Sequence, residues 1–316
     1  MGFVEREFLI EREQKILKFL VEEVGLSPRE GKRAIDRGRV SLNGKRVTNK
    51  GAVGKGVLKC ILFEPNGFGL TPFFETLHFA IYDKPSGVPI HPKKLANTKS
   101  LLDDHRRLYG PGANLVHRLD RETSGLVIGS KYKYAESELK RSFQEREVQK
   151  EYLALIWGVL ERGLEIKKPI EVNRDPEIKV KVQISPTGRE AVTIVEPVEV
   201  VEGGLTLVRL KPLTGRQHQL RVHLWSIGHP IVGDPLYGVP PEVGDRYLRR
   251  ILPVQERLHW TGATRLLLHA HRLQFQFFGN RYNIISPTNF REEIGRSLAP
   301  NWREIGKVTG KFKLGV

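Results

Sequence analysis

The spacing of apolar residues near the N-terminus predicts two short helices. Apolar residues recur at helical spacing over residues 16–24, where they form one stripe, and Gly25 then ends this first helix. A second helix is expected over residues 28–37, because Ser27 can cap it, a proline follows at the first helical position, and Glu30 completes a capping box.

Short alternating segments after these helices predict strands. Residues 40–42 and 45–47 alternate, and the Asn43-Gly44 pair between them is the strongest short signal for a β-hairpin. Residues 60–63 predict a further strand. The stretch 64–72 is rich in Gly and Pro and poor in apolar pattern, which is typical of a linker.

The pattern therefore divides the chain into a small N-terminal α/β domain at residues 1–64, a linker at residues 65–74 and a larger domain at residues 75–316. Strands dominate the larger domain, so we expect an α+β fold with a mixed, mostly antiparallel sheet. Its expected strands lie at residues 77–82, 152–157, 180–184, 191–195, 205–210, 266–270 and 273–277, with a turn at residues 186–189 between the third and the fourth. Its expected helices lie at residues 101–109, 132–145 and 215–225.

The charge of the chain predicts a binding partner. The 316 residues include 52 Lys and Arg against 36 Asp and Glu, a net charge of +16, which favours a polyanionic partner and above all nucleic acid. A basic protein without such a partner is the alternative. In the N-terminal domain, basic residues gather on the second helix and the hairpin, where phosphate contact is expected and a merely solvated helix face is the alternative. They include Arg29, Lys32, Arg33, Arg37, Lys45 and Arg46.

The composition also narrows the cellular setting. No apolar run is long enough to span a membrane, and the charged N-terminus lacks the apolar centre of a signal peptide. Cys60 is the single cysteine, which excludes an intramolecular disulfide and a cysteine-based metal cluster. We therefore expect a cytoplasmic protein, and a monomer.

One stretch, residues 114–128, combines apolar flanks with a lone carboxylate. Asp120 lies between Arg118 and Arg121, and the apolar segments on both sides predict buried strands, so Asp120 is expected on a loop at the mouth of a sheet. A carboxylate can act as a nucleophile toward a sugar carbon, because departure of a base leaves positive charge there. Glu122 is expected to point elsewhere, so no second acid is near. A structural Asp bridging two arginines is the alternative.

A second donor-rich stretch could serve this carboxylate. Arg216 and Arg221 lie within two turns, and Arg221 could pair with Asp120 or bind a phosphate. His218 and His223 are poorly spaced for a metal, so structural roles are favoured for them.

An aromatic residue completes the candidate chemistry. Tyr152 opens an apolar strand after a basic stretch, so its ring could stack on a base while its hydroxyl handles a proton; core packing is the alternative. The chain has neither of the glycine-rich spacings that bind NTP or NAD phosphates, which disfavours both chemistries.

Several stretches together resemble the RluA-type family of RNA pseudouridine synthases. They occur in order over residues 75–280, and they are 84–89, 117–126, 150–154, 188–193, 215–223, 229–238 and 266–270. The match is looser at residues 173–179 and 240–264. Residues 26–45 resemble the S4 RNA-binding domain, which often precedes this catalytic domain in family members that act on large-subunit ribosomal RNA.

The resemblance implies a role for each candidate residue. Asp120 would be the nucleophile, Tyr152 would stack on the target uracil and assist proton transfer, and Arg221 would pair with Asp120. Arg118 would occupy the gap left by the flipped base, and Leu268 would pack near the base. Arg216 and His218 complete the expected substrate-binding set, and no cofactor or metal is implied.

The expected reaction is therefore the isomerisation of uridine to pseudouridine in structured RNA, most readily ribosomal RNA. Uracil would leave C1′, turn and rejoin through C5, after base flipping. Whether Asp120 forms a C1′ adduct or drives a glycal route stays open. The alternatives are a synthase acting on tRNA, a non-catalytic RNA-binding or ribosome-assembly factor, and a hydrolytic nucleoside or glycan enzyme.

Overall fold

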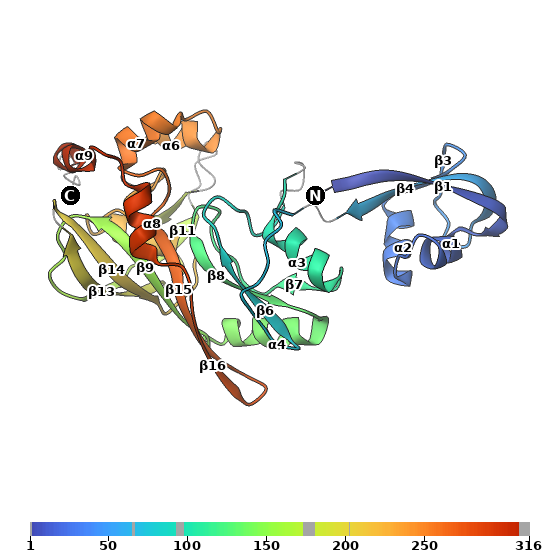
Figure 1. Ribbon diagram of the computed structural model, residues 1–316, viewed down its shortest axis with the longest axis horizontal. Coiled ribbons are helices and arrows are strands. Elements are labelled where there is room, and N and C mark those ends of the chain that lie inside the picture. The colour runs from blue at the N-terminus through green and yellow to red at the C-terminus, as the bar shows by residue number, and fades with distance from the viewer. Residues whose placement is uncertain (1, 65–66, 93–97, 173–180, 202, 310–316) are drawn as a thin grey trace. The chain divides into compact units, whose positions relative to one another are not determined.

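The computed structural model describes residues 2–64, 67–92, 98–172, 181–201 and 203–309 (Figure 1). By its contacts the chain forms two compact units. The first unit contains residues 1–69 and 91–107, and the second contains residues 70–90 and 108–316. The loosely matching segment 173–179 lies outside the described residues.

The first unit contains a four-stranded sheet with two helices packed on it, and most of α3 (Leu101–Tyr109) also belongs to this unit. The strand order is β1-β4-β2-β3, formed by β1 (Gly2–Lys15), β2 (Val40–Leu42), β3 (Lys45–Arg46) and β4 (Val53–Glu64). The helices α1 (Ile16–Glu22) and α2 (Pro28–Asp36) bury their apolar faces against it, and Leu20, Ile35 and Leu58 meet in the core. The predicted helices, hairpin and capping box are confirmed: the Ser27 hydroxyl accepts from the Glu30 amide, and the Glu30 carboxylate accepts from the Ser27 amide.

The sequence did not predict β1, a 14-residue strand that runs antiparallel to β4, and β4 itself begins earlier than expected. On one face of β1, charged residues pair with a charged residue of β4. The sequence of β1 therefore lacks the clear alternation of apolar and polar residues by which strands are predicted. Glu7 stands directly opposite Lys59 in the register, and their charged groups are 2.6 Å apart. Such cross-strand pairs stabilise an exposed sheet face without apolar residues.

The second unit is built on a ten-stranded sheet that is antiparallel except where β15 meets β8, among the strands that the structure describes. The path is β10-β13-β14-β9-β15-β8-β6-β5, with β16 added to β15 and β7 to β8. This confirms the predicted α+β class. The strands are β5 (Phe74–Glu75), β6 (Phe79–Lys84), β7 (Asn114–Leu115), β8 (Ser124–Ser130), β9 (Gln149–Trp157), β10 (Leu164–Lys167), β13 (Val192–Val201), β14 (Leu205–Pro212), β15 (Leu268–Phe277) and β16 (Asn280–Ile285).

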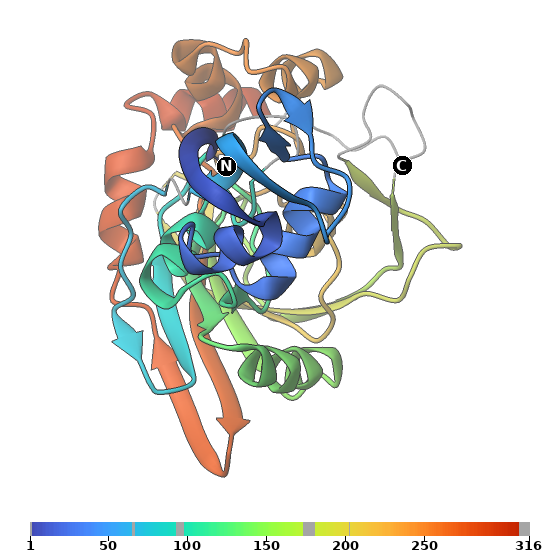
Figure 2. The ribbon, with the colours of Figure 1, turned by 90° about the vertical axis from the view of Figure 1, so that its right-hand side faces the viewer.

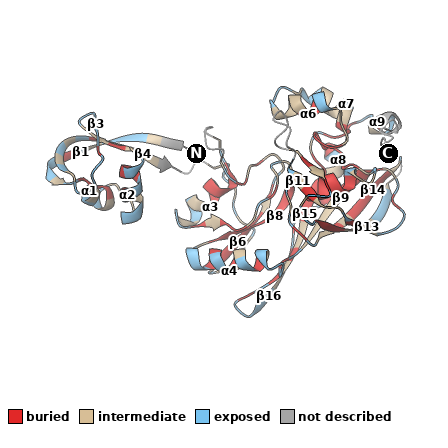
Figure 3. Cartoon of the chain, turned by 180° about the vertical axis from the view of Figure 1, so that it is seen from behind, coloured by how far each residue is buried: buried red, intermediate tan, exposed pale blue. Residues whose placement is uncertain are grey.

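Helices lie along this sheet and bury its apolar residues. The strand β8 and most of β15 are buried, and β9 is buried over its second half (Figure 3). Leu139 of α4 joins a core cluster with Phe79 and Ile128, and Leu224 of α5 joins another with Val208. The helices outside the first sheet are α3 (Leu101–Tyr109), α4 (Lys133–Gln144), α5 (Gln219–Trp225), α6 (Pro241–Leu248), α7 (Val254–Thr261), α8 (Phe290–Ser297) and α9 (Trp302–Thr309).

Two predictions about strands were wrong. The segments 180–184 and 191–195 do not pair with each other, because β12 (Val182–Ile184) pairs with β11 (Ile170–Val172) in a separate two-stranded sheet. The strand β13 instead pairs with β10 and β14. The segments 266–270 and 273–277 are one continuous strand, β15, which forms a long hairpin with β16 (Figure 2). An irregularity between Ala270 and Arg272 in the pairing with β9 interrupts the alternation, which accounts for the apparent break.

Within the described ranges, no helix has the length and apolar character to cross a membrane.

Candidate active site

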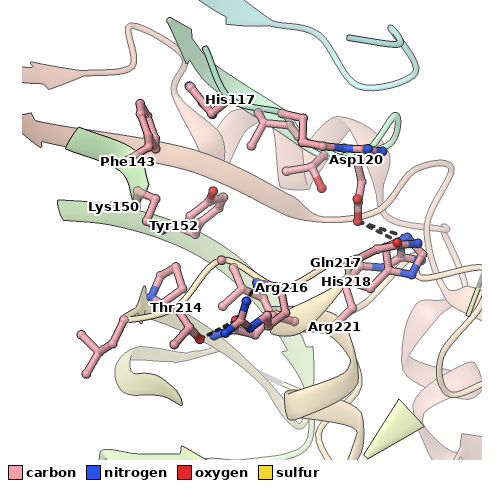
Figure 4. Close-up of a pocket in the computed structure, with 18 of the residues that line it drawn as sticks. His117, Asp120, Phe143, Lys150, Tyr152, Thr214, Arg216, Gln217, His218 and Arg221 are labelled. Carbon is pink, nitrogen blue, oxygen red and sulfur yellow. Dashed lines mark hydrogen bonds and ion pairs between the residues drawn. The ribbon is translucent and has the colours of Figure 1, made fainter. Parts of the chain in front are cut away.

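A pocket of about 910 Å³ opens in the second unit (Figure 4). Five parts of the chain line it: the loop between β7 and β8, the end of α4, the start of β9, the segment from the end of β14 into α5, and the start of β15. The pocket brings together all seven residues that the sequence assigned to catalysis and substrate binding, namely Arg118, Asp120, Tyr152, Arg216, His218, Arg221 and Leu268.

The loop that carries Asp120 is held by its neighbours on both sides. Lys84, a buried residue at the end of β6, donates from Nζ to the Arg121 carbonyl over 3.1 Å. Past the loop, Gly125 has φ +107°, and a Cβ there would come within 2.3 Å of the Ala270 carbonyl oxygen. Only glycine therefore allows β8 to approach β15 this closely, and that approach fixes one end of the loop.

Asp120 pairs with a buried arginine that a second carboxylate also holds. Arg221 on α5 donates from Nη1 to Asp120 Oδ2 over 3.1 Å. Its Nε and Nη2 donate to the two oxygens of Asp234, each over 2.7 Å. Arg221 and Asp234 are buried, whereas the side chain of Asp120 is 22% exposed. The bidentate pair with Asp234 fixes the guanidinium plane, so the remaining donor points at Asp120.

Sequence reasoning missed Asp234 as a functional residue. It lies within one of the family-like stretches, but nothing in the local pattern linked it to Arg221, 13 positions earlier. The available signal was physical: a buried guanidinium flanked by apolar residues requires a counter-charge.

Charges around Asp120 keep it ionised. Burial would raise the pKa of the Asp120 carboxyl. The His218 ring when protonated, the charge and hydrogen bond of Arg221, and the charge of Arg118 outweigh burial, so this pKa lies below its ordinary value. Burial, followed by the Arg221 charge, lowers the pKa of His218 to about 4. The His218 ring is therefore neutral near pH 7, where the two arginines hold the Asp120 charge.

His218 contributes contacts in the pocket wall. Its Nε2 is 3.6 Å from Asp120 Oδ2, and its Nδ1 hydrogen-bonds the Tyr237 hydroxyl over 3.1 Å. The residue has a left-handed backbone with φ 51°, directly before α5. This conformation is uncommon for residues other than glycine, although Asn, Asp and His adopt it more often than the rest, and it turns the imidazole from the helix start toward Asp120.

Tyr152 and Leu268 supply the apolar surface of the pocket. Tyr152 lies half-buried on β9 and packs against the core cluster that contains Leu268. Burial, and then the Asp120 charge, raise the pKa of Tyr152, so its hydroxyl stays protonated. A flat ring and an aliphatic side chain at one pocket can enclose a planar base.

Two residues next to Asp120 do not share its site. Arg121 is exposed and donates from Nε to the Gly87 carbonyl over 2.9 Å, which disfavours the alternative of a structural Asp that bridges Arg118 and Arg121. Glu122 turns away from the pocket, as expected. It accepts from Arg257 Nη2 over 2.6 Å and from the Tyr247 hydroxyl over 2.8 Å, which ties the loop to α6 and α7.

Other predicted positions are placed as follows. Arg216 lines the pocket and donates from Nε to the Glu190 carbonyl over 3.0 Å. His223 hydrogen-bonds Thr193 Oγ1 and the Lys168 carbonyl, each over 2.9 Å, which is a structural role. Among the side chains that the structure describes, no three His, Cys, Asp or Glu groups gather as metal ligands. In the first unit, all six predicted RNA-binding residues, Arg29, Lys32, Arg33, Arg37, Lys45 and Arg46, are exposed.

Known proteins are similar to this chain in sequence and in fold. Residues 78–226 match the RNA pseudouridylate synthase family model. An uncharacterised RNA pseudouridine synthase of Helicobacter pylori (strain ATCC 700392 / 26695) is 39% identical over 290 residues, covering 91% of this chain and 95% of that protein. The dual-specificity RNA pseudouridine synthase RluA of Escherichia coli (strain K12) is 38% identical over 226 residues, covering 70% of this chain and 94% of that protein. The solved structure of human RNA pseudouridylate synthase domain containing 1 aligns with a TM-score of 0.56 and 26% identity, covering 76% and 94% of the two chains.

Proposed function

The chain belongs to the RNA pseudouridylate synthase family, and from this premise we propose that Asp120 is the nucleophile with which it isomerises uridine to pseudouridine. RNA is its substrate, as membership of the family implies. The observation that carries the assignment of Asp120 is its place in the pocket wall, ionised and paired to Arg221, with Tyr152 lining the same pocket.

The proposed mechanism uses one carboxylate. When uracil leaves C1′, positive charge develops on the ribose, and the Asp120 carboxylate stabilises that charge or bonds to C1′. Glu122, the nearest other carboxyl in the sequence, is bound to Arg257 and Tyr247, so it does not protonate a departing base. The uracil stays in the pocket, turns, and forms the C5–C1′ bond, which breaks any bond between Asp120 and C1′. C5 then loses its proton, and N1, which no longer bonds the ribose, gains one. The adduct and glycal routes both fit these residues.

The remaining residues of the pocket position the base. We assign Tyr152 to stacking on the uracil and to proton transfer, because its hydroxyl is protonated and its ring is half-buried. Leu268 covers the base from β15. Arg118 is exposed at the pocket and makes no hydrogen bond or ion pair within the described residues, so it is free to fill the gap left by a flipped nucleotide. Arg216 and His218 complete the proposed substrate contacts.

We further propose that the substrate is large-subunit ribosomal RNA and that the protein acts as a cytoplasmic monomer. The first unit supports the ribosomal target, because its six exposed cations lie on α2, at Arg37 directly after it, and on β3, in a scaffold that resembles an S4 domain. We propose residues 1–64 as this RNA-binding domain. A free, buried Cys60 is compatible with a reducing compartment.

The test compares wild type with Asp120→Asn on unmodified transcripts of large-subunit ribosomal RNA and of tRNA, with pseudouridine mapped at each position. We expect pseudouridine in the ribosomal transcript, and a loss of roughly 10⁴-fold or more in rate for the variant. Normal activity of Asp120→Asn would exclude the proposed nucleophile. Modification of tRNA alone would overturn the ribosomal target, and salt-sensitive binding without any isomerisation would favour a non-catalytic RNA-binding factor.

A further inference from the structure

One half-buried cation of the pocket, Lys150, has no counter-charge at ion-pair distance among the described residues; the exposed Arg118 shares this property. Lys150, in β9, is half-buried and lines the pocket, yet its ammonium group makes no hydrogen bond or ion pair within the described residues. Lys140, which also lines the pocket, is different because its Nζ lies 2.6 Å from Glu136 Oε1. The guanidinium of Arg221 is held by two carboxylates.

Within the described residues, no carboxylate lies at ion-pair distance from Lys150, and Glu190, the nearby acid, is paired to Arg146. Asp120 is the single carboxylate residue among those that line the pocket, and it is paired to Arg221. Burial, followed by the Arg146 charge, lowers the pKa of the Lys150 ammonium. A partly buried cation beside another cation costs free energy in the unliganded protein, and an anionic ligand would offset this cost.

The geometry of β9 places this cation next to the proposed uracil site. Lys150 and Tyr152 are two positions apart on one strand, so their side chains project from the same face, about 6.8 Å apart along it. Figure 4 shows the two side chains as neighbours in the pocket. A Cβ added to Gly215 would lie 3.7 Å from Lys150 Nζ, so the glycine leaves the space beside the ammonium open.

We propose that Lys150 binds a phosphate of the RNA backbone adjacent to the uridine whose base stacks on Tyr152. The inference rests on the proposed function. In RNA the phosphodiester is the group that carries negative charge, whereas the uracil and the ribose are neutral, so a phosphate is the anion that this substrate can bring. A contact one step along the chain from the reacting nucleotide sets the register in which the uracil reaches Tyr152.

The first measurement compares Lys150→Met, Lys150→Arg and Lys167→Met with wild type. Lys167 is an exposed lysine of β10, paired to Glu165, outside the pocket, so its variant controls for the loss of one positive charge. For Lys150→Met we expect RNA to bind about tenfold more weakly, and the slope of log affinity against log salt to flatten by about 0.7. Lys150→Arg should recover most of the affinity, and Lys167→Met should change it less than about twofold. Unfolding temperatures equal to wild type would show that the variants fold.

The second measurement locates the phosphate. Once the modified uridine is mapped, single neutral methylphosphonates replace the phosphates on its 5′ and 3′ sides. We expect one of them to raise KM for wild type by about tenfold and to leave KM of Lys150→Met unchanged, because the partner cation is already absent. Equal penalties in the two proteins at both positions would overturn the inference while leaving the proposed function intact. A complete absence of pseudouridine from wild type reactions would instead refute the proposed function itself.

Discussion

At the scale of single residues, the site depends on one guanidinium shared by two carboxylates. Asp120 and Arg221 could be selected from the sequence, because each lies in a distinctive local pattern. Asp234 could not, because its importance comes from a contact between segments that only the fold brings together. The local sequence therefore predicts the reacting groups better than it predicts the groups that position them.

Replacing Asp234 with Asn should weaken both the fold and the site. The change leaves Arg221 with one formal counter-charge in a buried position, and removing one partner from a buried pair typically costs about 3 kcal/mol. We expect a loss of that order in the free energy of unfolding, measured by urea denaturation, and a reduced kcat. The control is Asp245→Asn, which breaks an exposed i,i+4 pair with Arg249 and should cost less than about 1 kcal/mol. Equal effects of the two changes would argue against the shared-guanidinium arrangement.

At the scale of elements, the loop of Asp120 depends on how β8, β15 and β6 are joined. The Ser124 hydroxyl lies 2.9 Å from His269 Nδ1, and His269 Nε2 lies 2.9 Å from Ser286 Oγ. Ser286 donates to Asp83 over 2.7 Å, so its oxygen accepts from His269 Nε2–H. His269 Nδ1 then accepts from Ser124, and the four side chains form a buried chain of hydrogen bonds with a single direction.

This buried chain predicts how stability depends on pH. Burial lowers the pKa of His269 to about 4, against about 6.5 when unfolded. Between these values the unfolded state binds the extra proton and the folded state does not, so the stability is fully present above pH 6.5 and is lost as the pH falls toward 4. His269→Gln should reduce the slope of the unfolding free energy against pH in this window, by up to the amount that corresponds to one bound proton. His259→Gln is the control, because that histidine lies on α7 outside the network. An unchanged slope for His269→Gln would show that another group titrates there.

The close approach of β8 to β15 makes a second prediction at this scale. Gly125→Ala adds a Cβ where φ is +107° and the Ala270 backbone is 2.3 Å away. The strain and the displaced strand should lower the free energy of unfolding by roughly 3 kcal/mol or more. Gly112→Ala serves as the control, since a Cβ there meets open space at an ordinary backbone angle. Thermal unfolding of both variants is the measurement, and similar unfolding temperatures would contradict the structure at this contact.

Elements with one clear apolar face were predictable from the sequence, and those without one were not. The capped helix α2 and the Asn-Gly hairpin follow from local signals. The charged strand β1, the separate β11–β12 pair and the helices α6 to α9 were not predicted, because cross-strand charges, distant pairing and packing against other elements define them.

At the scale of the whole molecule, the positive charge is divided between the pocket and the first unit. The cations of α2 belong to the unit that lacks the pocket, so they should contribute to RNA affinity and leave the chemical step unaffected. The sequence indicated this cluster of basic residues, since net charge and its clustering require no knowledge of the fold, and its contact with RNA stays a prediction.

Neutralising three of these cations tests this division of charge. The triple change Lys32→Gln, Arg33→Gln and Arg37→Gln should flatten the slope of log affinity against log salt by about 2 and raise KM. The rate at saturating RNA should stay within about twofold of wild type. Lys18→Gln, an exposed helix residue of the same unit that is paired with Glu22, is the control. A large fall in kcat for the triple variant would show that the first unit takes part in the reaction step.

The trio of Asp120, Arg221 and Asp234 holds one positive and two negative charges, so it carries a net charge of −1 in a largely dry wall. A ribose that loses its base gains a charge of about +1. Within this trio one negative charge is therefore left for the ribose, and its attraction is strongest when the bond to the base breaks, because the ribose is positively charged only then. Arg118 lies close enough to lower the pKa of Asp120, so the carboxylate is already ionised while the substrate is intact.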